Sequence, residues 1–106
     1  MEYEYDGEGL NGASITDGLI MVVEDVFSIA GRGTVLTGKI LSGPVFINDK
    51  IQIVSPNGTV IDTKINAIEA FRKSLDTAEA GENVGLLVRG VDRSDVEPGD
   101  SVRRRD

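Results

Sequence analysis

Residues 33–39 have the spacing of a phosphate-binding loop. They read Gly-Thr-Val-Leu-Thr-Gly-Lys, which fits a Walker A pattern up to its lysine. The next residue of such a loop must be a Ser or Thr that binds magnesium, and Ile40 stands there instead. The β-branched residues between the glycines also favour a strand over a loop that opens a helix. We therefore expect no nucleotide site and no bound cofactor.

Glu24 and Asp25 are adjacent carboxylates, which suggests acid–base chemistry. Neighbouring residues on a strand point to opposite faces, so these two groups cannot share one proton as a catalytic pair. The chain has no Cys and no His, which removes the usual bases of a catalytic triad and the usual zinc ligands. Carboxylates alone could hold magnesium or calcium, but no group of them stands out. We predict a protein without a metal site that is not an enzyme.

Both patterns lie in residues 19–41, which we predict to form a long hairpin. Two β-branched runs meet at residues 30–33, Ala-Gly-Arg-Gly, where the glycines permit the positive φ of a tight reversal. Residues 50–54 alternate polar and apolar side chains, as a strand with one buried face does. Residues 55–58, Ser-Pro-Asn-Gly, predict a hairpin turn.

The rest of the chain adds further strands. Residues 60–71 read as one continuous strand in which Glu69 interrupts an apolar series, and residues 100–104 read as a closing strand. About six strands with frequent turn signals and no helical periodicity predict an all-β fold, because closure of the sheet removes exposed edges. The expected architecture is a closed antiparallel six-stranded β-barrel.

Negative charge is concentrated at the N-terminus. Residues 1–18 contain five acids and no Lys or Arg, whereas the remaining 13 acids nearly balance 11 bases, and the net charge is −7. We predict a flexible acidic arm over residues 1–18 and a barrel domain over residues 19–106. The arm is interpreted either as a partner-binding tail or, preferably, as a solvated terminus.

Basic residues are sparse for a generic nucleic-acid-binding protein, which usually carries a strong basic excess. The densest basic run, Arg103 to Arg105, either attracts RNA phosphate or, as we favour, solubilises the chain end. Arg32 and Arg89 stand beside glycines and either hold a turn carbonyl or pair with an acid such as Glu82. The apolar runs are far too short to span a membrane and no signal-peptide pattern is present, so we expect a cytoplasmic protein.

Several motifs closely resemble domain II of elongation factor Tu and related translation GTPases. The opening hairpin of that domain is matched by residues 24–29, Glu-Asp-Val-Phe-Ser-Ile, and by residues 31–38, Gly-Arg-Gly-Thr-Val-Leu-Thr-Gly. Its far end is matched by residues 71–73, Phe-Arg-Lys, residues 80–85, Ala-Gly-Glu-Asn-Val-Gly, and residues 89–90, Arg-Gly. The resemblance runs roughly from Leu19 to Val102 and implies the β-barrel of that domain. Asn48 stands where the family has Gly, a mild change because Asn tolerates left-handed geometry.

The resemblance also implies a site, since in this family the barrel surface takes the aminoacylated 3′ adenosine of tRNA. The RNA-binding positions that it implies are Glu24, Asp25, Phe27, Ile29, Val35, Thr37, Asn83 and Leu87. Ile29, Val35 and Leu87 would sandwich the adenine. Glu24 would accept a hydrogen bond from the ribose, and the Asn83 backbone would meet the aminoacyl group. A competing interpretation assigns the three apolar residues to the core.

A full elongation factor adds a GTPase domain and a second barrel, to which no residues of this sequence correspond. The resemblance therefore implies a stand-alone, non-enzymatic binding module that engages the tRNA acceptor end or ribosomal components, with a GTPase domain or another protein as a further possible partner. The alternative is a barrel that mediates protein–protein interaction or self-association without RNA binding.

Overall fold

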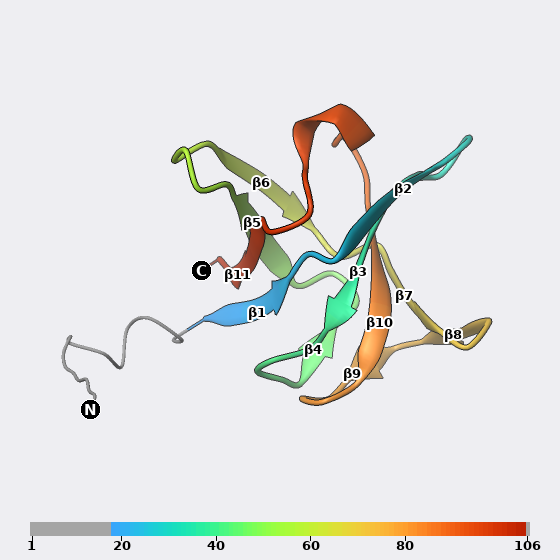
Figure 1. Cartoon of the computed structure of the whole chain (residues 1–106). Coiled ribbons are helices and arrows are strands. Elements are labelled where there is room, and N and C mark those ends of the chain that lie inside the picture. The colour runs from blue at the N-terminus through green and yellow to red at the C-terminus, as the bar shows by residue number, and fades with distance from the viewer. Residues whose placement is uncertain (1–17, 106) are drawn as a thin grey trace, which may run out of the picture.

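Eleven strands and one short 3₁₀ helix form residues 18–105, the part of the chain that the computed structural model describes (Figure 1). The strands are β1 Leu19–Val22, β2 Asp25–Ile29, β3 Gly33–Lys39, β4 Val45–Phe46, β5 Lys50–Val54, β6 Val60–Lys64, β7 Ala67–Ala70, β8 Lys73–Leu75, β9 Thr77–Ala78, β10 Asn83–Val88 and β11 Ser101–Arg104. The helix, η1, spans Arg93–Asp95. The all-β prediction is confirmed. The predicted acidic arm lies outside the described residues, except for Gly18.

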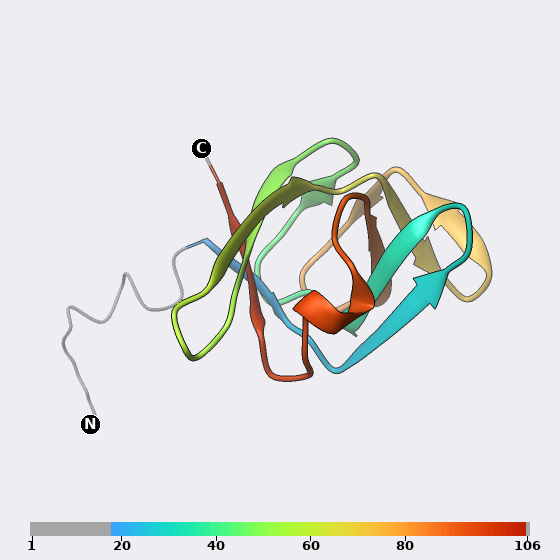
Figure 2. The same ribbon diagram turned by 90° about the horizontal axis from the view of Figure 1, so that it is seen from above.

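The strands pair in three antiparallel sheets, so the prediction of one closed six-stranded barrel is wrong. A four-stranded sheet has the order β1-β11-β5-β6, a five-stranded sheet has the order β2-β3-β10-β7-β8, and β4 pairs with β9. Seen from above, the β5–β6 and β2–β3 hairpins lie on opposite sides, with η1 between them (Figure 2). The sheets share one core, which contains residues from both of the larger ones.

Two bends in the chain explain why the strands form two large sheets and not one. Between β1 and β2, the Val23 N–H donates to the Asp100 carbonyl, and the next N–H, that of Glu24, donates to the Thr37 carbonyl (both 2.8 Å). Between β6 and β7, the Ile65 N–H donates to Asp49 (3.0 Å) and the Asn66 N–H donates to Leu87 (2.8 Å). At each bend, one residue thus bonds to the segment next to the four-stranded sheet, and the following residue bonds to a strand of the five-stranded sheet.

The second bend also changes which side chains of residues 60–71 are buried. Ile65 and Ile68 are both fully buried although they are three residues apart. A single strand would bury every second residue, so the bend shifts the alternation by one position. The prediction of one continuous strand is therefore wrong, and Glu69 points away from the core instead of interrupting a buried series. Elsewhere the alternation is as predicted, since Ile51 and Ile53 of β5 are buried.

The turns agree with the sequence. Residues 30–33 connect β2 to β3, where Gly31 and Gly33 have φ of 77° and 140°. The Asn57–Gly58 segment connects β5 to β6, with φ of 92° at Gly58. Asn48 has φ of 78°, the left-handed geometry that Asn tolerates.

Gly38 allows β1 to lie against β3. A Cβ at this position would be 2.7 Å from the Val22 carbonyl oxygen and 2.8 Å from the Met21 Cγ. Both neighbours belong to β1 of the four-stranded sheet, whereas Gly38 belongs to the five-stranded sheet. The absence of a side chain at Gly38 is therefore what permits the two sheets to approach at this point.

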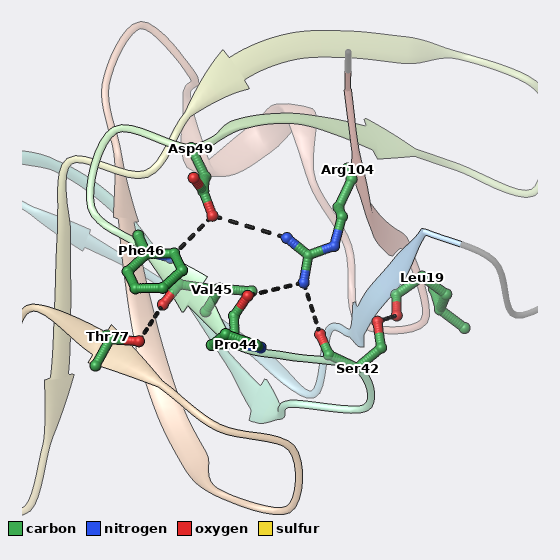
Figure 3. Close-up of polar contacts among 8 residues, drawn as sticks. All are labelled: Leu19, Ser42, Pro44, Val45, Phe46, Asp49, Thr77 and Arg104. Atoms are coloured by element: carbon green, nitrogen blue, oxygen red, sulfur yellow. Dashed lines mark hydrogen bonds and ion pairs between the residues drawn. The ribbon is translucent and has the colours of Figure 1, made fainter.

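Arg104, near the C-terminus, is part of the fold (Figure 3). The Arg104 guanidinium donates to the carbonyls of Ser42 (3.2 Å) and Pro44 (2.9 Å) and lies 3.7 Å from the Asp49 carboxylate. That carboxylate also accepts from the Phe46 N–H at 2.9 Å. Close by, the Ser42 hydroxyl donates to the Leu19 carbonyl and the Thr77 hydroxyl to the Val45 carbonyl. Our preferred interpretation of this run as a solubilising end is wrong, because Arg104 holds β11 to the loop before β4.

Gly38→Ala is expected to reduce the free energy of unfolding by about 3 kcal/mol, because its methyl group would overlap backbone and side-chain atoms of β1. Gly58→Ala is the control, since nothing lies within 4 Å of a Cβ there. Its cost should be limited to about 1 kcal/mol from the positive φ. Urea unfolding measures both values. Equal losses in the two variants would contradict a steric role for Gly38.

Arg104→Ala should reduce the free energy of unfolding by about 1–2 kcal/mol, because two carbonyls lose a charged donor that is itself partly exposed. Lys73→Ala removes the same charge from an exposed position on β8 and should change stability by less than about 0.5 kcal/mol. The urea concentrations at the midpoints of unfolding compare the stabilities of the two variants. If Arg104→Ala is as stable as Lys73→Ala, the arginine does not hold the C-terminal strand.

Candidate nucleic-acid interface

The five-stranded sheet has one face toward the core and one face away from it. One cross-strand row is buried in the core and consists of Val26, Leu36, Leu86 and Ile68. Side chains alternate along a strand, so the two flanking rows point the other way. One of these rows consists of Asp25, Thr37, Gly85 and Glu69. The other consists of Phe27, Val35, Leu87 and Ala67. We call the surface that they form, together with Ile29 and Asn83 at the next alternate positions, the outer face.

The outer face brings together seven of the eight residues implied by the resemblance. They are Asp25, Phe27 and Ile29 on β2, Val35 and Thr37 on β3, and Asn83 and Leu87 on β10. Glu24 is exposed in the bend just before β2, and its N–H is bonded to Thr37. It therefore lies at the border of the same surface. Their contact with RNA stays a prediction.

The three apolar residues differ in exposure. Ile29 and Val35 are half-buried and lie outside the core cluster, so the competing core interpretation is wrong for both. Leu87 is only 4% exposed but is also outside that cluster, which agrees with its position on the other side of the sheet. Ile29 and Val35 can thus offer surface to a ligand, whereas Leu87 forms the floor between its neighbours.

Gly85 lies directly beside the Val35 side chain in the middle of the outer face. A Cβ there would be 2.9 Å from the Val35 Cγ1 and 3.8 Å from the Thr37 Cγ2. The missing side chain of Gly85 therefore lets the Val35 side chain lie over the backbone of β10. A flat aromatic group fits such an apolar surface, and the carboxylates of Asp25 and Glu69 in the same row can accept hydrogen bonds from its polar edge.

Glu69 belongs to the outer face although the sequence analysis did not assign it to the site. Its carboxylate accepts a hydrogen bond from the Arg32 guanidinium at 3.4 Å, between side chains that are 39% and 49% exposed. Arg32 therefore pairs with an acid, as one interpretation expected, but with Glu69 and not with Glu82. Because Arg32 precedes Gly33 and Glu69 lies opposite Gly85, this ion pair spans the row of Val35 and Leu87. The sequence feature that could have identified Glu69 is its charge within an otherwise apolar series.

The two patterns that suggested chemistry have other roles. Residues 33–39 are the strand β3, which is bonded to β2 on one side and β10 on the other, so they do not form a phosphate loop. No group of three or more acids is placed to hold a metal ion among residues 18–105. Within the same residues, no helix is long and apolar enough to cross a membrane.

A family model of elongation factor Tu domain 2 matches residues 33–103, about two thirds of the chain. The matched segment begins at β3 and includes β7 and β10. It therefore contains Val35, Thr37, Asn83 and Leu87 of the outer face, as well as Gly85 and Glu69.

Proposed function

Because the chain belongs to the elongation factor Tu domain 2 family, we propose that it is a translation-factor binding module whose outer face binds the acceptor end of a tRNA. Domain 2 is a non-catalytic part of translation GTPases, so the proposal involves no chemical step. The observation that carries it is the pair of half-buried apolar side chains, Val35 and Ile29, on the face opposite the core.

The terminal adenine would lie against Val35 and Ile29, with Leu87 beneath it. The carboxylate of Glu24, at the border of the face, would accept a hydrogen bond from a ribose hydroxyl. Asn83 begins β10, where pairing with β3 is already present but pairing with β7 starts only at Gly85. The β7 side of this first part of β10 therefore has no neighbouring strand, which leaves room for the aminoacyl group.

The expected affinity is low. One stacked base and one or two hydrogen bonds give a dissociation constant of about 0.1–1 mM for a short acceptor-stem mimic. The Arg32–Glu69 ion pair crosses the row of Val35 and Leu87, so the ligand must also displace or stack on the guanidinium. Exposed ion pairs contribute about 0–1 kcal/mol, so displacement costs little.

A protein-binding role is the second candidate, and one observation favours it. Phe71, at the turn between β7 and β8, is 92% exposed and lines a depression together with Ala70 and Leu75. Exposed apolar side chains of this size often mark protein contacts. Asn83 of the outer face also lines this depression, so the two candidates are separated by whether a bound ligand affects Val35 and Ile29 or only Phe71 and Leu75.

Gly85→Ala should weaken binding of an acceptor-stem RNA that ends in adenosine by about tenfold, because the added methyl group overlaps the Val35 Cγ1 and displaces the side chain that the base contacts. Glu24→Ala should weaken it by about threefold through loss of one hydrogen bond. Amide shifts in a nuclear magnetic resonance titration report both the constants and the residues affected. Gly85 does not have a positive φ, and an added Cβ would overlap one side-chain methyl group and no backbone atom, so the fold should survive. Amide spectra of the free variant that change only near Val35 would verify this.

Glu79→Ala is the matched control, since it removes an exposed carboxylate outside the outer face. Its affinity for the RNA should equal that of the unaltered protein. Two results together would contradict RNA binding on the outer face and favour the second candidate. They are amide shifts confined to the surroundings of Phe71 and Leu75, and a dissociation constant that Gly85→Ala leaves unchanged.

A further inference from the structure

Several basic residues gather around an open depression of about 470 Å³ at the end of the β5–β6 hairpin. We call it the basic cleft. Its lining residues are Lys50, Thr63, Lys64, Asn66, Arg89 and Arg105. They come from the start of β5, the end of β6, the bend before β7, and the segments that follow β10 and β11. Four of the six are cationic and none is acidic, in a chain whose net charge is −7.

The cations of the basic cleft are poorly compensated. Lys50 lies directly opposite Lys64 in the β5–β6 pair, and like charges in this arrangement destabilise a sheet. Among residues 18–105, no carboxylate lies within ion-pair distance of Lys50, Lys64 or Arg89. Arg105 pairs with Asp62 at 3.1 Å, but its Nε is buried without a hydrogen-bond partner. A bound anion would offset this local repulsion.

The basic cleft adjoins the outer face. Arg89 is the first residue after β10 and lies two residues beyond Leu87. Asn66 directly precedes Ala67, which lies opposite Leu87, and the Asn66 N–H is bonded to the Leu87 carbonyl. The Thr63 hydroxyl donates to the Arg89 carbonyl at 3.2 Å, which fixes that segment beside β6. An RNA strand that leaves the outer face past Leu87 thus meets the cationic side chains next.

We propose that the basic cleft binds the phosphodiester backbone of the RNA strand whose terminal nucleoside lies on the outer face, an inference that rests on the proposed function. Lys50, Lys64 and Arg89 supply separate cations from three segments, which matches a row of phosphates better than one anion. The cleft adds salt-dependent affinity to a face that otherwise binds mainly by apolar contact.

Binding of a single-stranded RNA tests the proposal. The RNA has about eight nucleotides and a 3′ adenosine, and its dissociation constant is measured at about 50 and 200 mM salt. Three phosphate contacts predict that the logarithm of the association constant falls with the logarithm of salt at a slope of about −2, or about a 20-fold loss of affinity over this range. The double variant Lys64→Gln, Arg89→Gln should retain a slope of about −0.7.

The double variant Arg72→Gln, Lys73→Gln is the matched control, because it removes the same charges from the β7–β8 hairpin, outside the basic cleft. It should keep the original slope. A slope that is equally steep in the cleft variant would overturn the proposal. Inorganic phosphate that competes with the RNA at about 1 mM would overturn it too, since that result indicates a single-anion site.

Free adenosine separates this proposal from the proposed function. It carries no phosphate, so it should shift outer-face amides equally in the unaltered protein and in the cleft variant. If adenosine binds in this way but the slope does not depend on the cleft, only the present proposal fails. If adenosine shifts no outer-face amide while the slope does depend on the cleft, the proposed function fails.

Discussion

The contact of β1 with Gly38 of β3 is the constraint on which the rest of the structure depends. β3 is bonded on both sides, by β2 and by β10, so it cannot move aside for another strand. Only the missing side chain of Gly38 lets Met21 and Val22 of the other large sheet come within 3 Å of a Cβ position. This contact directs one face of the five-stranded sheet inward and leaves the opposite face available for binding.

The two bends between the sheets also shape both proposed binding surfaces. The bend before β2 contains Glu24, at the border of the outer face. The bend before β7 contains Asn66, which lines the basic cleft, and it follows Lys64 directly. It also shifts the alternation, so that Ile68 is buried and Glu69 is directed outward. The features that divide the expected barrel into separate sheets are therefore the ones that position polar groups around the apolar side chains of the outer face.

Local signals in the sequence predicted the parts of the fold that local geometry determines. The turn at Asn57–Gly58 and the alternation of β5 follow from single-residue preferences and strand periodicity. The bends did not show in the sequence, because the residues at them include neither Gly nor Pro and depend on hydrogen bonds to distant carbonyls such as Asp100 and Leu87. Arg104 was misjudged for the same reason, since its partners are about 60 residues away in the chain.

The family resemblance supplied all eight positions of the candidate site. The pairing of β2, β3 and β10 places seven of them on one face, and their contact with RNA stays a prediction. Glu69 was missed because its direction depends on the shift in alternation at the preceding bend.

Intermolecular nuclear Overhauser effects between an RNA that ends in adenosine and methyl-labelled protein test the central claim most directly. If the outer face holds the terminal base, the adenine H2 and H8 protons should show cross-peaks to the methyl groups of Val35 and Ile29, with weaker ones to the nearly covered Leu87. Adenine cross-peaks only to methyl groups away from this face, such as those of Leu75 or Val60, would contradict the account.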